Sequence, residues 1–246
     1  MVRHPEAARG SISSQGLLQV HLLGNLSLDE TLRLQRSLVY RLGESSLGGA
    51  LLLVEHPPFV TVGRHGKASD LPFASPEFLR QGWPIRWVAR GGETVLHLPG
   101  QLAIYPIVSL NRLQLSLEGY LALLHQVLHD LLDDFSIQAH SRSDLAGVLV
   151  QQRQIASVGV AIRQQMTLFG AVLNVDPDLT WCRLIPSAHE ATSLARERRG
   201  PLRHALVRQQ LVEHLRHRFG FDETTMVFAR PDQPNHERIA LDRGTA

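Results

Sequence analysis

The stretch RGGETVLHLPGQ, residues 90–101, places a glycine turn, a short strand-like segment and a second turn in succession. Arg90, Gly91 and Gly92 supply a cation and two residues that are free to adopt positive φ. Such a turn can direct backbone N–H groups toward a carbonyl or an anion, although an ordinary tight turn explains it equally. His97 can donate a hydrogen bond to an acyl or thioester oxygen. The alternative for His97 is a core histidine whose hydrogen bonds are satisfied internally.

Apolar clusters on both sides of this stretch alternate between strand-like and helix-like spacing, which favours a mixed α/β architecture. The run at residues 50–55 ends at His56-Pro57-Pro58 because proline has no N–H to donate to a sheet. Strands are expected over residues 17–23, 50–55, 102–108, 147–151, 155–162 and 166–175.

Three helices are predicted. Ser27 and Glu30 form a capping box at the start of the first. Residues 116–135 carry one wide leucine-rich stripe, and residues 202–219 precede Gly220, which is placed to cap a helix.

The composition narrows the classes of function. The 246 residues are 43% hydrophobic with a net charge of +2 and a pI near 9.1, and no basic cluster or apolar membrane-length run is present. We therefore expect a monomer that binds neither nucleic acid nor a membrane. A single cysteine, Cys182, and no apolar secretory region near the start favour the reducing cytoplasm.

Three segments in this order resemble one family. They are residues 55–64 (EHPPFVTVGR), residues 90–101 with the following Tyr105-Pro106, and residues 154–159 (QIASVG) with Gly170–Asn174. Together they resemble the octanoyltransferases, the lipoate–protein ligase B family, over roughly Leu17 to Phe219.

The resemblance implies an α/β (α+β) fold like the catalytic domain of biotin and lipoate protein ligases, with a mixed sheet and flanking helices. This domain would span residues 17–228, between a mobile N-terminal tail, 1–16, and a C-terminal tail, 229–246. Members transfer octanoyl from acyl carrier protein to a lysine of a lipoyl domain. A cysteine carries the acyl group as a thioester and a lysine lowers the pKa of its thiol. Neither a cofactor nor a metal is implied.

The resemblance also assigns site residues. His56, Arg64 and Gln101 are expected to have supporting roles. The expected substrate-binding residues are Arg90, Gly91, Gly92, His97, Ser157, Val158, Gly159, Gly170, Ala171 and Val172.

This chain departs from the family at both reacting positions. Ser187 stands where the cysteine belongs, in a segment that also looks shorter, and Gln154 stands at the lysine position. Arg153 adjoins that position but should point to the opposite face of its strand, and a guanidinium cannot act as a base. Leu98 and Phe169 replace a small and a polar residue, which should make the site drier and tighter.

Three functions stay open on the sequence. The first is an acyl-binding protein that does not transfer by the cysteine–lysine route. The second is an active acyltransferase that uses Ser187 with His189 or His97. Cys182 is a poor substitute unless the loop folds back, because five extended residues separate it from Ser187 by roughly 17 Å. The third is an interaction module whose pocket has been filled.

Overall fold

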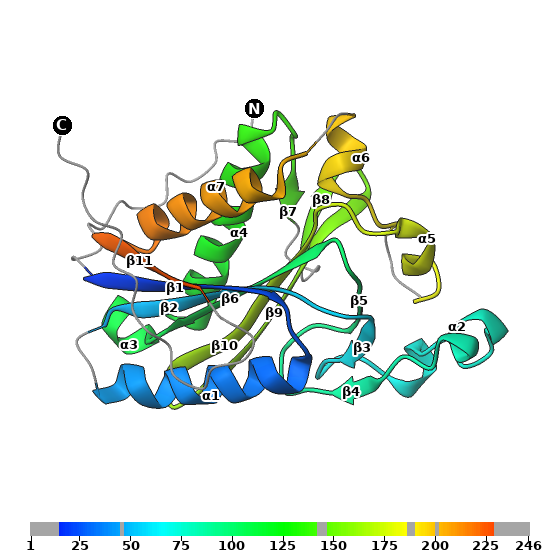
Figure 1. Cartoon of the computed structure of the whole chain (residues 1–246), viewed down its shortest axis with the longest axis horizontal. Helices are drawn as coiled ribbons and strands as arrows, with labels where there is room; N and C mark the ends of the chain where they lie inside the picture. Colours follow the sequence, from blue (N-terminus) through cyan, green and yellow to red (C-terminus); the bar gives the residue numbers. More distant parts are fainter. Residues whose placement is uncertain (1–14, 45–46, 142–146, 186–189, 200–201, 229–246) are drawn as a thin grey trace.

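Residues 15–44, 47–141, 147–185, 190–199 and 202–228 are described by the computed structural model, and within them a mixed sheet of eight strands forms the centre (Figure 1). In spatial order the strands of this sheet are β11 (Glu223–Phe228), β1 (Leu17–Asn25), β2 (Gly49–Glu55), β6 (Gln101–Val108), β10 (Met166–Asn174), β9 (Arg153–Arg163), β8 (Gly147–Val150) and β7 (His140–Ser141). Within this sheet, β1 pairs in parallel with both β11 and β2, and the other neighbouring strands are antiparallel.

All six strands predicted from the sequence are confirmed, with ends that differ by one or two residues. The edge strands β7 and β11 were not predicted. β11 is mostly exposed or half-buried, so its sequence does not have the apolar run of a central strand. β11 joins the sheet by pairing in parallel with β1, a contact between distant parts of the chain that the local sequence does not indicate.

A second, three-stranded sheet is inserted between the neighbouring strands β2 and β6. It contains β3 (Phe59–Val62), β4 (Ile85–Trp87) and β5 (Thr94–His97). The short helices η1 (Ala68–Asp70) and α2 (Pro76–Gln81) connect β3 to β4. The insertion brings residues 90–101 back against the central sheet, since β5 leads through one turn into β6 (Figure 1).

Helices cover both faces of the central sheet (Figure 1). Helix α1 (Leu28–Glu44) lies on one face, and the Ser27 and Glu30 capping box is present, with reciprocal backbone bonds of 3.1 and 3.3 Å. Helices α4 (Leu117–Asp134) and α7 (His204–Arg218) lie on the other. All three helices confirm the sequence prediction. The shorter helices are α3 (Leu110–Leu113), α5 (Leu179–Cys182) and α6 (Leu194–Arg198).

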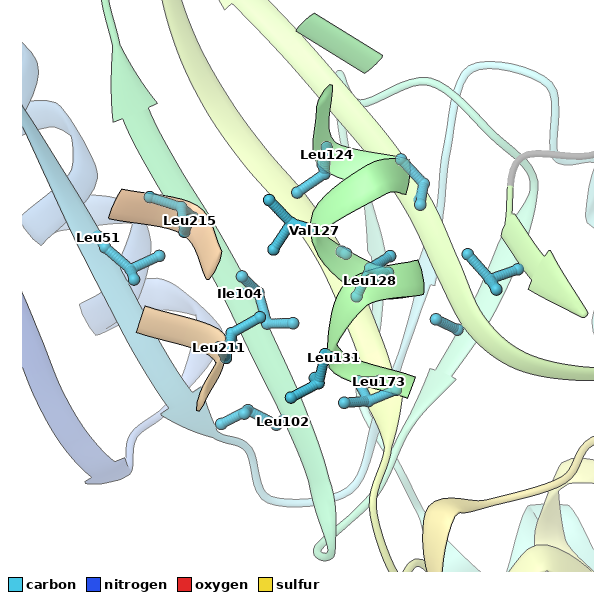
Figure 2. Close-up of a cluster of buried hydrophobic side chains, with 14 of the residues drawn as sticks. Leu51, Leu102, Ile104, Leu124, Val127, Leu128, Leu131, Leu173, Leu211 and Leu215 are labelled. Atoms are coloured by element: carbon cyan, nitrogen blue, oxygen red, sulfur yellow. The ribbon is translucent and has the colours of Figure 1, made fainter. Parts of the chain in front are cut away.

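The larger hydrophobic core lies between the sheet and the pair α4–α7 (Figure 2). Leu128 and Leu131 of α4 and Leu211 of α7 are fully buried there against Ile104 of β6. Their spacing places one apolar face of each helix on the sheet, as the stripe over residues 116–135 predicted. The opposite face of the sheet packs on α1 through a second cluster that includes Leu38, Tyr105 and Phe169.

The ends of the described chain meet at one side of the domain. The Gln15 N–H donates to the Gly220 carbonyl at 3.0 Å, and the Gly16 N–H donates to Asp222 at 3.1 Å. The rest of the expected N-terminal tail and the C-terminal tail, 229–246, lie outside the described residues. No described helix combines the length and apolarity needed to span a membrane.

Truncating Leu128 to alanine should lower the free energy of unfolding by about 2–5 kcal/mol, because the change leaves a cavity where α4 meets the sheet. Urea unfolding followed by circular dichroism measures the change. Leu79→Ala is the matched control: Leu79 is 56% exposed on α2, and its loss should change stability by about 0.5 kcal/mol or less. Equal effects of the two substitutions would contradict the assigned core.

Candidate functional site

Two adjoining cavities lie where β9 and β10 meet the small sheet. Val95, Ser157 and Val172 line both. The first cavity has a volume of about 20 Å³, and all the expected substrate-binding residues except Gly91 and Gly92 line it. The second has a volume of about 70 Å³, and its lining includes Gln101 and Gln154. Most of the residues that the sequence grouped together therefore meet in space.

Arg90 is a buried cation, 6% exposed, held entirely by oxygen atoms of its own neighbourhood. Its Nη2 donates to Thr61 Oγ1 at 2.8 Å and to the Glu93 carbonyl at 3.0 Å, and its Nη1 donates to the Gly91 carbonyl at 2.9 Å. Burial lowers the pKa of Arg90 to about 10, so the guanidinium stays charged at neutral pH. The side chain thus fixes the glycine turn and places a positive charge at the cavity wall.

His97 is 4% exposed, and its Nε2 lies 2.9 Å from Thr61 Oγ1, which also accepts from Arg90. A hydroxyl has one proton and two lone pairs, so Thr61 can donate to Nε2 or accept from it; donation pairs the buried Thr61 proton and favours the tautomer with the ring proton on Nδ1. Nδ1 has no hydrogen-bond partner among the described residues. Burial, with smaller effects from His56 and Arg90, lowers the pKa of His97 well below its usual range. His97 is therefore a neutral donor with a free N–H.

His56 supports the same wall without lining either cavity. Its Nδ1–H donates to the Leu26 carbonyl at 2.6 Å, and its Nε2 accepts from the Tyr105 hydroxyl at 3.0 Å. Burial lowers the pKa of His56 to about 4, so this ring is also neutral at pH 7. Both nitrogens are occupied, and His56 acts on the first cavity only by holding Tyr105, which lines it.

The glycine turn differs from the simplest expectation. Gly92 adopts positive φ, at 78°, whereas Gly91 does not. The Gly91 N–H donates to the Val160 carbonyl at 2.8 Å, so it is not available to a ligand. A Cβ at Gly159 would lie 2.6 Å from the Gly91 carbonyl oxygen, which means that the turn packs directly on β9. The side chain of Arg64 is exposed. Its backbone N–H donates a hydrogen bond to the Arg90 carbonyl at 3.0 Å, which helps to hold the turn.

Gln154 lines the second cavity, and its amide nitrogen lies against Gly147 on β8. The neighbouring Arg153 points away from the cavity and pairs with Glu197 of α6, with N–O distances of 2.9 to 3.1 Å. This orientation confirms the prediction from strand alternation. No cation of β9 lines the second cavity.

A chain of amide hydrogen bonds joins three distant segments below the second cavity. Gln101 accepts from the Leu98 N–H at 2.8 Å and donates to Asn174 at 2.9 Å. Asn174 donates in turn to the Thr192 carbonyl at 2.9 Å. Ile185 and Ala191 both line this cavity. Ser187 and His189 lie outside the described residues, so the expected roles of both stay predictions.

Cys182 lines the second cavity together with Gln154, at the end of helix α5. Its distance from Ser187, on which the sequence argument rested, involves a residue outside the described part of the chain. Burial, with a smaller effect of Asp178, raises the pKa of the Cys182 thiol to about 11. The thiol is therefore protonated at neutral pH.

The two residues expected to tighten the site behave differently. Phe169 lines the first cavity, packs edge-on against Tyr105 and has a positive φ of 60°, an uncommon conformation for a bulky residue. Its N–H is held by Gln35 at 3.1 Å. Leu98 is buried in the cluster of the small sheet and lines neither cavity. Only Phe169 narrows the first cavity.

Sequence reasoning missed three functional neighbours: Thr61, Tyr105 and Asn174. Each is a polar residue in or at the end of an otherwise apolar strand. A polar group that interrupts such a run must find a partner when it is buried, and this was the available signal. Taken together, the arrangement offers apolar walls for a chain and one oriented N–H donor for an oxygen.

Comparisons with known proteins agree with this geometry. The family model of the lipoyl protein ligase A/B catalytic domain matches residues 27–220. An octanoyltransferase of Nitratidesulfovibrio vulgaris strain DP4 is 38% identical over 182 residues, which cover 71% of this chain and 82% of that protein. An octanoyltransferase of Syntrophobacter fumaroxidans is 35% identical over 205 residues, which cover 81% and 90%.

Solved structures share the fold at low identity. A crystal structure of lipoate-protein ligase A bound with ATP has a TM-score of 0.69 at 14% identity and covers 87% of this chain and 90% of its own. A bi-partite lipoate protein ligase of Thermoplasma acidophilum has a TM-score of 0.68 at 14% identity and covers 87% of each. These likenesses confirm the lipoate-ligase-like α/β fold expected from the sequence.

The neutral His56 predicts a pH dependence of stability. As pH falls from 6.5 to about 4, His56 is protonated in the unfolded chain but stays neutral in the folded chain. The free energy of unfolding therefore decreases by up to roughly 1.4 kcal/mol per pH unit. His56→Gln should flatten this slope, measured by urea unfolding at pH 4.5, 5.5 and 6.5. The control His65→Gln changes an exposed histidine and should keep the slope of the unmodified protein. An unchanged slope in His56→Gln would show that this ring is not held neutral.

Proposed function

This chain belongs to the octanoyltransferase family of lipoyl protein ligase A/B catalytic domains, and we propose that it binds an octanoyl group without transferring it by the family's cysteine–lysine route. The observation that carries the proposal is Gln154 at the second cavity. By the resemblance, this is the position of the family lysine. An amide carries no charge and is neither an acid nor a base near neutral pH, so it lacks the positive charge with which a lysine lowers the pKa of a thiol.

The lining of the first cavity supports the binding half of the proposal. Its walls include Leu28, Val158 and Ala171, which are apolar like an acyl chain. Its volume of about 20 Å³ holds no more than about one water, so an octanoyl group would bind there only if side chains such as Phe169 move. His97 Nδ1–H supplies one hydrogen-bond donor for the acyl carbonyl oxygen. The buried positive charge of Arg90 stabilises partial negative charge on that oxygen. Binding of an acyl oxygen would also relieve the buried, unpaired N–H, which otherwise destabilises the free protein by about 1–3 kcal/mol.

The partners follow from the family. The acyl group would arrive as octanoyl-acyl carrier protein, and a lipoyl domain would be the acceptor in any residual transfer. Cavities of only about 20 and 70 Å³ do not count against a module that acts through surface contacts alone, and titration with octanamide separates that module from an acyl-binding protein.

Replacing His97 with phenylalanine should weaken binding of octanamide, an uncharged acyl probe, by about tenfold, since one hydrogen bond of about 1.4 kcal/mol is lost. The substitution keeps the ring that stacks on Phe59 at 4.3 Å, so packing is conserved. Isothermal titration calorimetry measures the affinity, and His65→Phe at an exposed position is the control. Equal affinities in His97→Phe and the unmodified protein would remove His97 from the acyl site.

A second candidate is a slow acyltransferase that uses Cys182, and it rests on the position of this residue in the second cavity. The Cys182 sulfur would attack the thioester carbon of octanoyl-acyl carrier protein. The new sulfur–carbon bond would replace the old one, and the carrier thiol would leave with the proton of Cys182. The raised thiol pKa opposes this step, because only a small fraction is thiolate at neutral pH.

Intact mass after incubation with octanoyl-acyl carrier protein separates these readings. We expect no adduct on this chain under conditions that acylate a family member with both cysteine and lysine. An adduct that Cys182→Ser abolishes would establish the second candidate instead. An adduct that Ser187→Ala abolishes would make Ser187 the acyl acceptor and would overturn the proposal of binding without transfer.

A further inference from the structure

A third hollow, with a volume of about 670 Å³, lies between the C-terminal half of α1, helix α3 and the β9–β10 hairpin. It shares no lining residue with either cavity of the acyl site. Its volume falls within the range of small-molecule sites in proteins, roughly 300–1,000 Å³. The hollow is therefore a separate candidate site, and none of the family motifs contributes to it.

Three arginines from three different elements line this hollow: Arg36 of α1, Arg112 of α3 and Arg163 at the end of β9. The described lining contains no acidic residue. Arg112 is anchored by a hydrogen bond from its Nη1 to the Leu47 carbonyl. No ion pair joins Arg36 or Arg163 to another described residue. Three like charges in one hollow repel each other unless an anion lies between them.

The hairpin that presents Arg163 is itself unusual. Its two central residues, Gln164 and Gln165, both have positive φ, at 50° and 61°, in a turn where glycine or asparagine is preferred. The turn is held by the Leu110 N–H, which donates to the Gln165 carbonyl at 2.8 Å. Backbone strain of this kind concentrates at ligand sites, where the surroundings fix a conformation that the sequence disfavours. Gln164 lines the hollow beside Arg163.

One wall of the hollow is apolar. Tyr40, one turn after Arg36 on α1, is 68% exposed, and Val39, Met166 and Leu168 line the same hollow. An exposed aromatic ring beside guanidinium groups offers a surface for the body of an organic anion. A bare inorganic ion would use the arginines and leave this wall uncovered.

We propose that this hollow binds a small organic phosphate, with the phosphate between Arg36, Arg112 and Arg163 and the organic part against Tyr40. A phosphate monoester carries a charge near −2 and three acceptor oxygens, which match several guanidinium groups better than one carboxylate does. The size of the hollow favours a small molecule over an extended protein surface. This proposal goes beyond acyl binding and does not depend on it.

Phenyl phosphate is the probe, and calorimetric titration of the full chain at low salt measures its affinity. We expect one molecule to bind per chain, inorganic phosphate to bind more weakly and phenol not to bind at all. The double variant Arg36→Ala/Arg163→Ala should bind phenyl phosphate more weakly by about tenfold or more, since each charge-assisted hydrogen bond contributes about that factor. Raising the salt concentration should weaken binding, because these side chains are exposed.

Arg41→Ala is the matched control, because Arg41 is an exposed arginine of the same helix that does not line the hollow. It should keep the affinity of the unmodified protein. If Arg41→Ala lost as much affinity for phenyl phosphate as the double variant, the loss would reflect only the change in net charge, and the proposed site would be wrong. Failure of phenyl phosphate to bind would also overturn it, and selective binding of an acidic peptide instead would identify the hollow as a protein-docking surface. Octanamide affinity, measured on the same variants, should not change.

Discussion

Arg90 carries its charge into the interior, and each partner that its guanidinium meets in the described chain is a carbonyl or hydroxyl oxygen. A buried cation without a carboxylate is stable only when several dipoles surround it, so the glycine turn and β3 must keep their places around this side chain. Thr61 Oγ1 accepts one of these bonds, and its own proton can then pair with His97 Nε2, which favours the tautomer that leaves Nδ1–H unpaired. One buried charge thus holds the turn and the strand and supports the orientation of His97.

A second constraint joins the parts of the site that are far apart in sequence. Gln101 and Asn174 connect the turn after β5 to the end of β10 and to the carbonyl of Thr192. Their amides are buried, and a buried amide that lost its partner would destabilise the fold by about 1–3 kcal/mol. Buried hydrogen bonds between three segments therefore fix the described wall of the second cavity.

The sequence predicted the longer elements, β1, β2, β6, β9, β10 and the three long helices, because seven or more residues define a pattern, and it also predicted β8, a run of only four buried residues. Of the small sheet, only the stretch before His97 was read as strand-like, because strands of three or four residues carry few alternating positions and β4 and β5 are partly exposed. Among the site residues, the glycine and histidine positions followed from the family pattern. The approach of Cys182 did not, because it depends on how α5 turns the chain. The His97 tautomer was equally hidden, since it requires knowing that Thr61 and Arg90 lie beside the ring.

The chemistry of the described site is consistently that of donors rather than of bases. Both buried histidines are neutral, with depressed pKa values, and each already uses its accepting nitrogen, His56 for Tyr105 and His97 for Thr61. Gln154 cannot exchange a proton, and the Cys182 thiol is driven toward its protonated form. Such a set can hold a carbonyl oxygen and line an acyl chain, but it contains no described group whose pKa suits proton removal at neutral pH. Among the described residues, a buried donor without a base nearby fits the proposed acyl binding better than rapid turnover.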